Sequence, residues 1–77
     1  MTLRNMIDNG INIQGIIKIQ SWGDKDYPEV YYEGNIEIDG TKAIKKYLDR
    51  DIQYIFPYVV KVGIVSVGAI CIEIEEK

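Results

Sequence analysis

Apolar and polar residues alternate with a period of two in several stretches of the chain, and this alternation constrains the fold more than any other feature. Such alternation is typical of strands with one buried face. In the first stretch, "INIQGIIKIQSW", the apolar face holds Ile11, Ile13, Ile17 and Ile19. In the second, "EVYYEGNIEI", it holds Val30, Tyr32, Ile36 and Ile38, and the other face is acidic. The turn-forming loop "SWGDKDYP" between them predicts an antiparallel hairpin.

Two more strands are expected in the second half of the chain. In "IQYIFPY" the alternating residues are Ile52, Tyr54, Phe56 and Tyr58. This pattern places Tyr54 and Phe56 in the core. The following segment is unusually apolar, with a turn expected near Gly63 and a last strand from about Ala69 to Glu75. In that strand we expect Ile70, Ile72 and Ile74 to point inward, and Cys71, Glu73 and Glu75 outward.

Two short helices complete the prediction. "TLRNMIDNG" has an N-cap residue, Thr2, and a glycine, Gly10, that can end the helix. After Asp39-Gly40-Thr41, which offers two N-caps, the apolar stripe of Ile44, Tyr47 and Leu48 opposes Lys42, Lys45 and Lys46. The order helix, two strands, helix, two strands predicts a single α+β domain over residues 1–77. We expect two layers, with one four-stranded sheet and two short helices.

Composition and charge exclude several functions. The net charge of −3 argues against direct binding of nucleic acid or of an anionic membrane, since both require an excess of Lys and Arg. No stretch has the length and apolarity of a membrane span or the organisation of a signal peptide, so we expect a cytoplasmic protein. The absence of His and the presence of one cysteine, Cys71, argue against the common catalytic triads, so we expect no enzyme and no cofactor.

The stretch "YLDRDIQYIFPY" combines aromatic rings with charged residues and has two interpretations. It could be a ligand site, or a boundary where Asp49, Arg50 and Asp51 form the solvated end of a helix. We favour the boundary. A pocket between Tyr47, Tyr54, Phe56 and the sheet remains the alternative, and it would make the protein a small-ligand binder.

Neighbouring carboxylates give little support for catalysis or for metal binding. The pairs Asp49 with Asp51 and Glu73 with Glu75 do not face each other across a cleft, as glycosidase chemistry requires. The loop residues Asp24, Asp26 and Glu29 are a fragment of a calcium site without its full ligand count. We therefore expect neither catalytic residues nor a metal, and a carboxylate-based hydrolase is the weakest of three hypotheses.

Two surfaces are candidates for protein binding. Aromatic rings interleaved with acidic residues are typical of protein interfaces; the candidates are Trp22, Tyr27, Glu29, Tyr31, Glu33 and Glu37. Packing of Trp22 and Tyr27 over the end of the hairpin is the other interpretation. The second surface is a homodimer interface in the C-terminal apolar segment, with Val60, Val62, Val65 and Val67, since valines in this number are rarely bare on a monomer.

The segments "MTLRNMIDNGINIQGIIKIQSW", "VYYEGN", "YLDRDIQYIFPY" and "ICIEIE" resemble a group of small accessory proteins encoded by phages and conjugative elements of gut bacteria. The resemblance implies a setting in which small proteins bind host factors, including CRISPR-type defence effectors. It also implies that the acidic strand "EVYYEGNIEI" could imitate nucleic-acid phosphates. The leading hypothesis is therefore a non-enzymatic, homodimeric interaction module with a host protein as partner.

Overall fold

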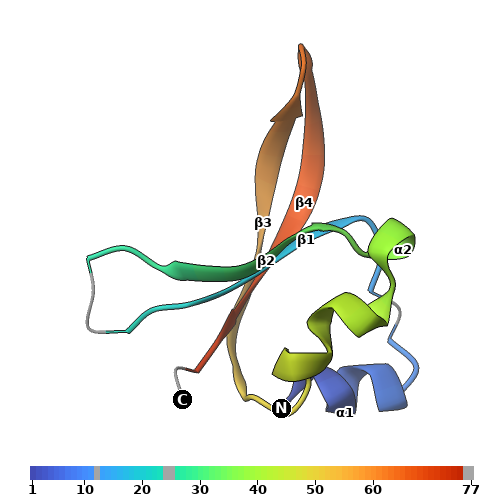
Figure 1. Cartoon of the computed structure of the whole chain (residues 1–77), viewed down its shortest axis with the longest axis vertical. Coiled ribbons are helices and arrows are strands. Elements are labelled where there is room, and N and C mark those ends of the chain that lie inside the picture. Colours follow the sequence, from blue (N-terminus) through green and yellow to red (C-terminus); the bar gives the residue numbers. More distant parts are fainter. Residues whose placement is uncertain (12, 24–25, 76–77) are drawn as a thin grey trace.

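The computed structural model describes residues 1–11, 13–23 and 26–75, which form one mixed sheet and three short helical segments. The strands are β1 (Ile16–Ser21), β2 (Glu29–Asn35), β3 (Ile52–Val62) and β4 (Val65–Ile74). The helical segments are α1 (Leu3–Asp8), α2 (Ile36–Asp39) and the 3₁₀ helix η1 (Thr41–Tyr47). These segments lie together beside the lower half of the sheet (Figure 1). The predicted α+β fold with one four-stranded sheet is confirmed.

The sheet consists of two hairpins joined along their inner strands. Its order is β2-β1-β4-β3, with antiparallel pairs β1–β2 and β3–β4 and a central parallel pair β1–β4. A parallel pair needs a long crossover connection. Here α2 and η1 lie within that connection, and they cover one face of the sheet (Figure 1).

Local sequence explains how α1 starts. The Thr2 hydroxyl accepts a hydrogen bond from the Asn5 backbone N–H at 3.1 Å, and the Asn5 side chain accepts one from the Thr2 N–H at 3.0 Å. This reciprocal arrangement is a capping box, with Asn in place of the more common Glu. Gly10 then takes the left-handed conformation with φ 83°, which ends the helix as the sequence predicts.

Strand β2 ends earlier than its alternation predicts. The Asn35 side chain accepts a hydrogen bond from the Glu37 N–H at 3.0 Å and caps the one-turn helix α2. Ile36 is buried by this turn, but Ile38 points to solvent. The N-caps expected in Asp39-Gly40-Thr41 do not form, because no side chain makes a cap hydrogen bond to η1. The Asp39 carboxylate instead accepts a hydrogen bond from the Tyr32 hydroxyl at 2.6 Å. The cause is Asn35, which is a better helix cap than a strand residue.

The core lies between the helical segments and one face of the sheet. Its buried residues are Leu3, Ile17, Ile19, Ile36, Ile44, Ile72 and Ile74. Tyr47 and Leu48 pack against it, so the predicted stripe of the second helix is confirmed. Ile11 and Val30, which the alternation placed inside, are about half exposed.

A β-bulge reverses the predicted faces of β3. Ile52 pairs with Ile74, but Tyr54 pairs with Glu73, so Gln53 is the extra residue. Paired residues share a face, and the bulge therefore puts Ile52 on the helix side and Tyr54 on the opposite side. Tyr54 is 65% exposed and Phe56 39% exposed. Their predicted place in the core is wrong.

A second bulge alters β2. Between Ile19 paired with Tyr32 and Gln20 paired with Val30, the strand has one additional residue, Tyr31. Both tyrosines consequently pack on the helix-side core. The Tyr31 ring stacks on Tyr47, with centroids 5.2 Å apart. The bulge also places Glu29 and Glu33 on opposite faces, so the expected continuous acidic face does not form.

The C-terminal hairpin is longer than predicted. The turn at Gly63 is confirmed, with φ 65°, but β4 begins at Val65 and not near Ala69. Burial in β4 also departs from simple alternation, because Cys71 and Glu73 are buried together with Ile72 and Ile74. Ile70, predicted to point inward, is partly exposed. Cys71 and Glu73 are buried because β4 is a central strand: Cys71 lies between its cross-strand neighbours Lys18 and Phe56, and Glu73 lies between Gln20 and Tyr54.

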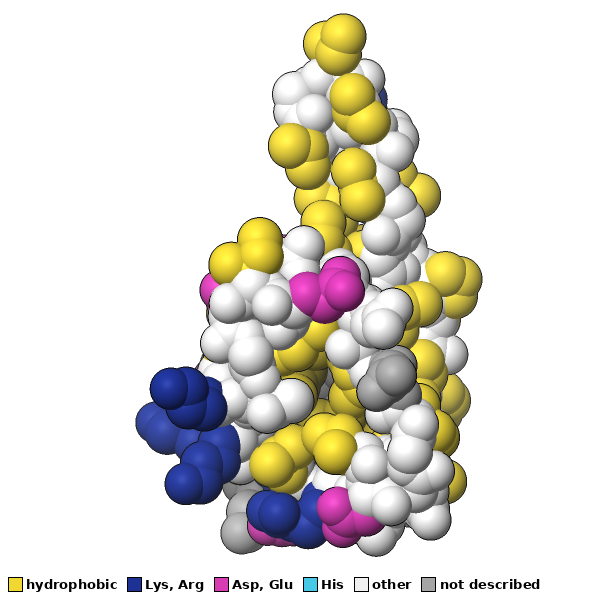
Figure 2. Space-filling view, turned by 90° about the vertical axis from the view of Figure 1, so that its right-hand side faces the viewer, with side chains coloured by type: hydrophobic (Ala, Val, Ile, Leu, Met, Phe, Trp, Pro, Cys, Tyr) yellow, Lys and Arg dark blue, Asp and Glu magenta, His cyan; other side chains and the backbone are white. Residues whose placement is uncertain are grey.

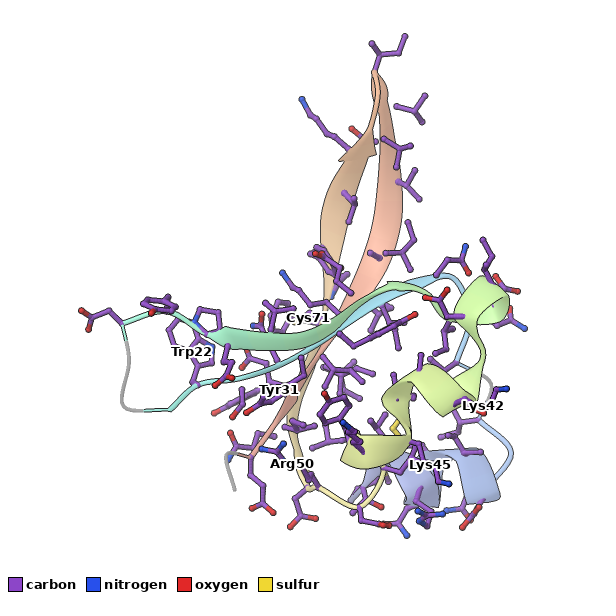
Figure 3. The ribbon with its side chains drawn as sticks, in the orientation of Figure 1. Trp22, Tyr31, Lys42, Lys45, Arg50 and Cys71 are labelled. Carbon is purple, nitrogen blue, oxygen red and sulfur yellow. The ribbon has the colours of Figure 1, made fainter. Side chains whose placement is uncertain are left out.

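The segment 49–52 forms backbone hydrogen bonds with residues at both ends of the described chain. Ile52 N–H donates to the Met1 carbonyl at 2.7 Å, and Glu75 N–H donates to the Asp51 carbonyl at 2.9 Å. Asp49 and Asp51 are exposed, but Arg50 is not simply solvated as predicted. Its guanidinium lies 4.9 Å from the centre of the Tyr31 ring and donates to the Glu75 carbonyl at 2.7 Å (Figure 3). This stretch is a structural junction.

Candidate functional site

The face of the sheet opposite the helical segments has no covering layer among the described residues, and we call it the bare face. The register assigns to it Ile16, Lys18, Gln20, Val30, Glu33, Tyr54, Phe56, Tyr58, Ala69, Cys71 and Glu73. It therefore combines rings, charged groups and apolar groups from all four strands. Surfaces of this composition are typical of protein interfaces.

A buried carboxylate lies near one end of the bare face. Glu73 is only 8% exposed and pairs with Gln20 on β1 and Tyr54 on β3. Its Oε2 accepts hydrogen bonds from Gln20 Nε2 at 2.6 Å and from the Trp22 indole N–H at 2.9 Å. Trp22, labelled in Figure 3, follows the end of β1 and is 49% exposed. The result is a carboxylate held by Gln20 and Trp22, with Tyr54 as its cross-strand neighbour on β3.

A second polar network crosses the middle of the bare face. The Tyr58 hydroxyl donates to Glu33 Oε2 at 3.0 Å, and the Lys18 ammonium lies 4.4 Å from the centre of the Tyr58 ring. Burial raises the pKa of the Tyr58 phenol well above its ordinary value, and the hydrogen bond to Glu33 adds to the effect. The network leaves Tyr58 as a neutral hydrogen-bond donor at physiological pH.

Cys71 lies in the centre of the face and is fully buried. Burial raises the pKa of its thiol, because the low-polarity surroundings disfavour the thiolate. The thiol is therefore in its unreactive form near neutral pH.

The bare face continues into a projecting part of the C-terminal hairpin, residues 59–68, which we call the arm. β1 pairs with β4 only from Ala69 onward, so the arm is a ribbon of two strands. One side of the ribbon consists of two cross-strand pairs, Val60 with Val67 and Val62 with Val65. This valine face belongs to the same side of the sheet as the bare face. Ile64 at the tip is fully exposed, and apolar side chains cover much of the arm (Figure 2).

The residues predicted to bind a partner are only partly brought together. Trp22 and Glu33 lie at the bare face, and Tyr27 is exposed in the loop between β1 and β2. Tyr31 and Glu29 belong to the helix side, and the Glu37 carboxylate accepts a hydrogen bond from Gly15 N–H at 3.1 Å. The predicted dimer residues, in contrast, form one surface, the valine face.

Sequence reasoning missed the most organised groups of the site. The alternation places Glu73 on the outward face of its strand, yet Glu73 is only 8% exposed and is hydrogen-bonded to Gln20, which is 5% exposed. The available signal was an amide and a carboxylate set within long runs of isoleucine and valine, where a polar side chain needs a buried partner.

The helix side carries a small apolar groove between α1 and the sheet, with a volume of about 340 Å³. It is lined by Met6, Ile11, Ile13, Gln14, Ile17, Ile55, Ile70 and Ile72. None of these side chains titrates, so the groove has no group for acid–base chemistry. The predicted aromatic pocket does not form, because Tyr47 packs on the helix side whereas Tyr54 and Phe56 belong to the bare face.

The described residues contain no group of three or more side chains able to hold a metal ion. Asp24, one of the loop carboxylates considered above, lies outside the described residues. Lys42, Lys45 and Lys46 are exposed, and Figure 3 shows Lys42 and Lys45 on the helical layer, far from Trp22. Within the described ranges, no helix has the length and apolarity needed to cross a membrane.

Comparison of the chain with protein-family models, with curated proteins and with solved structures gives no match.

Proposed function

We propose that the chain is a non-enzymatic protein-interaction module that works as a homodimer. The observation that carries the proposal is the continuity of the bare face with the valine face. Together they form an apolar and aromatic surface along β3 and β4 that lacks a covering layer among the described residues. Exposed apolar surfaces of this extent normally mark interfaces in soluble proteins.

A second copy of the chain is the partner that suits the valine face. Two sheets pack face to face at about 10 Å when their inner side chains are apolar and branched. The paired valines Val60–Val67 and Val62–Val65 provide such a surface without a charge. A two-fold contact would place the same valines against each other, which is the self-complementary arrangement that a symmetric dimer requires.

The size of the molecule supports this interface. The accessible surface of 5399 Å² exceeds the roughly 4,800 Å² expected for a compact monomer of this mass. The excess is about 600 Å² per chain. An interface that covered it on both chains would bury about 1,200 Å² in total, which is the lower limit for standard stable interfaces. An isolated two-stranded ribbon is also only marginally stable in water, so contact with a second copy would stabilise the arm.

The chemistry of the site supports a non-enzymatic role. The chain has no His, the Cys71 thiol is buried with a raised pKa, and Glu73 is engaged by two donors. The glutamates of 29–37 point in different directions, so they do not form the acidic strip that a phosphate-imitating inhibitor needs. The proposed partner, in addition to a second copy, is therefore a protein surface.

A charge pair on the valine face tests the proposal. In the double variant Val62→Glu, Val65→Lys, the two new side chains are directly opposite each other, so the hairpin keeps a favourable cross-strand pair. We expect light scattering to give the mass of a dimer for the unmodified chain and that of a monomer for the variant. Ser66→Glu is the control, because it adds an acid opposite Lys61 on the other side of the arm. An unmodified chain that is monomeric, or a variant that remains dimeric, would contradict the proposal.

A further inference from the structure

We infer that the cluster of Trp22, Tyr54 and Glu73, which we call the Glu73 site, binds an arginine side chain of a partner protein. This inference rests on the proposed function, because the interacting protein supplies the arginine.

The first argument is the state of the carboxylate. Glu73 is 8% exposed, and a carboxylate so buried costs free energy unless hydrogen bonds and an opposite charge compensate. Its two hydrogen bonds come from neutral groups, the Gln20 amide and the Trp22 indole. Both go to Oε2, and Oε1 accepts none from the residues that the structure describes. The site therefore holds the Glu73 side chain in place with one oxygen, Oε1, left to accept a hydrogen bond.

The second argument is the ring on each side of the carboxylate. Tyr54 lies directly across from Glu73 on β3, and Trp22 reaches Glu73 from the end of β1. The two rings, Tyr54 and Trp22, are 65% and 49% exposed. Aromatic faces attract cations, and the attraction is larger when the cation is partly desolvated. A carboxylate and two rings in one place thus select a cation and disfavour an anion.

The third argument concerns the kind of cation. A guanidinium is planar and stacks on aromatic faces, and one of its N–H groups can donate to the remaining oxygen, Oε1, while its plane lies against a ring. An ammonium group is more strongly hydrated and offers no planar face. The Glu73 site offers flat rings and an oriented carboxylate, and both features favour arginine over lysine.

The site is separate from the arm. Trp22 lies at the far end of the β1–β2 hairpin, whereas the arm projects at the opposite end of β3 and β4 (Figures 1 and 3). Dimerisation through the valine face therefore leaves the Glu73 site available, and each dimer would present it twice.

Fluorescence titration tests the inference, because Trp22 is the single tryptophan of the chain. The probe is Nα-acetyl-arginine methylamide, and the comparison compounds are the lysine and citrulline analogues. Citrulline has nearly the shape of arginine without its charge. We expect saturable binding of the arginine probe, weaker binding of the lysine analogue and no saturation with citrulline. Equal responses to arginine and citrulline would overturn the inference.

Variants locate the binding. Glu73→Gln should weaken the arginine probe about tenfold or more, since it removes a charge-assisted hydrogen bond. Glu75→Gln removes the same charge from an exposed position of the same strand region and should leave the affinity within about twofold. Tyr54→Leu, at an exposed position that should not affect folding, is expected to weaken binding about two- to fivefold. If Glu73→Gln and Tyr54→Leu both bind the arginine probe as tightly as the unmodified protein does, the inference is wrong. If Glu73→Gln does not fold, the affinity of Tyr54→Leu alone decides.

The same titration on Val62→Glu, Val65→Lys separates this inference from the proposed function. We expect the monomeric variant to bind the arginine probe as the dimer does. A chain that proves monomeric but binds arginine through Glu73 would contradict the dimer and leave the Glu73 site intact. A chain that is a dimer but shows no saturable binding of the arginine probe would support the proposed dimer and contradict the Glu73 site.

Discussion

Ile19 and Phe56 are both large apolar residues in strands, but only Ile19 lies in the core. Ile19 is fully buried, whereas Phe56 is 39% exposed on the bare face. We therefore expect Ile19→Ala to lower the free energy of unfolding by about 2–5 kcal/mol, and Phe56→Ala by roughly 1 kcal/mol. Urea unfolding followed by circular dichroism measures both values. Equal losses, or a larger loss for Phe56→Ala, would contradict the assignment of the two faces.

The tyrosines predict a loss of stability at alkaline pH. Burial and the hydrogen bond to Asp39 raise the pKa of Tyr32 to about 12, from an ordinary value of 10.0. Burial likewise raises the pKa of Tyr58. Because the folded protein holds these protons more tightly than the unfolded chain, the contribution of both tyrosines to stability is complete below pH 10, and that of Tyr32 is lost as the pH rises from about 10 to 12.

Urea midpoints measured across this interval should therefore fall, and they should fall less in Tyr32→Phe, which has no phenolic proton to lose. An absorbance titration of the folded protein in which all six tyrosines ionise together near pH 10 is the contrary result.

At the scale of elements, the arm is the part of the sheet with the fewest partners. Its amides bond only within the hairpin, because β1 does not extend beyond Ile16. We expect rapid hydrogen exchange at residues 59–62 and 65–68 in the monomeric variant Val62→Glu, Val65→Lys, and slow exchange in β1 and at residues 69–74. In the unmodified protein, protection of the arm should rise with protein concentration. Protection that does not depend on concentration would indicate that the arm is stable by itself.

The sequence predicts most elements, but not the faces of the strands. Alternation located β1, β3 and the C-terminal hairpin, and the caps located α1. The alternation predicts the wrong faces after Gln53 and at Tyr31, because at each place a single extra residue forms a bulge and exchanges the two faces of the strand. A bulge depends on the register with a neighbouring strand, which a local pattern does not contain. The valines of the proposed dimer surface were predictable because no helix is long enough to cover them, whereas the Glu73 site depends on the pairing of β1 with β4.

At the scale of the whole molecule, the chain is more extended than a compact domain of the same length. The radius of gyration is 12.5 Å, compared with roughly 11.5 Å for a compact domain of this length. The difference reflects two hairpins that extend in different directions from a small core (Figure 1). In a dimer, the valine faces and part of the bare faces would become a shared second core. Such a core would also supply burial that a chain of 77 residues can hardly provide by itself.

Sedimentation equilibrium of the unmodified chain tests this central claim most directly. At tens of micromolar we expect twice the mass of one chain, with dissociation on dilution and a melting temperature that rises with protein concentration, because association stabilises the folded state. A single-chain mass over the whole concentration range, with a constant melting temperature, would contradict the account and leave the valine face as exposed surface of a monomer.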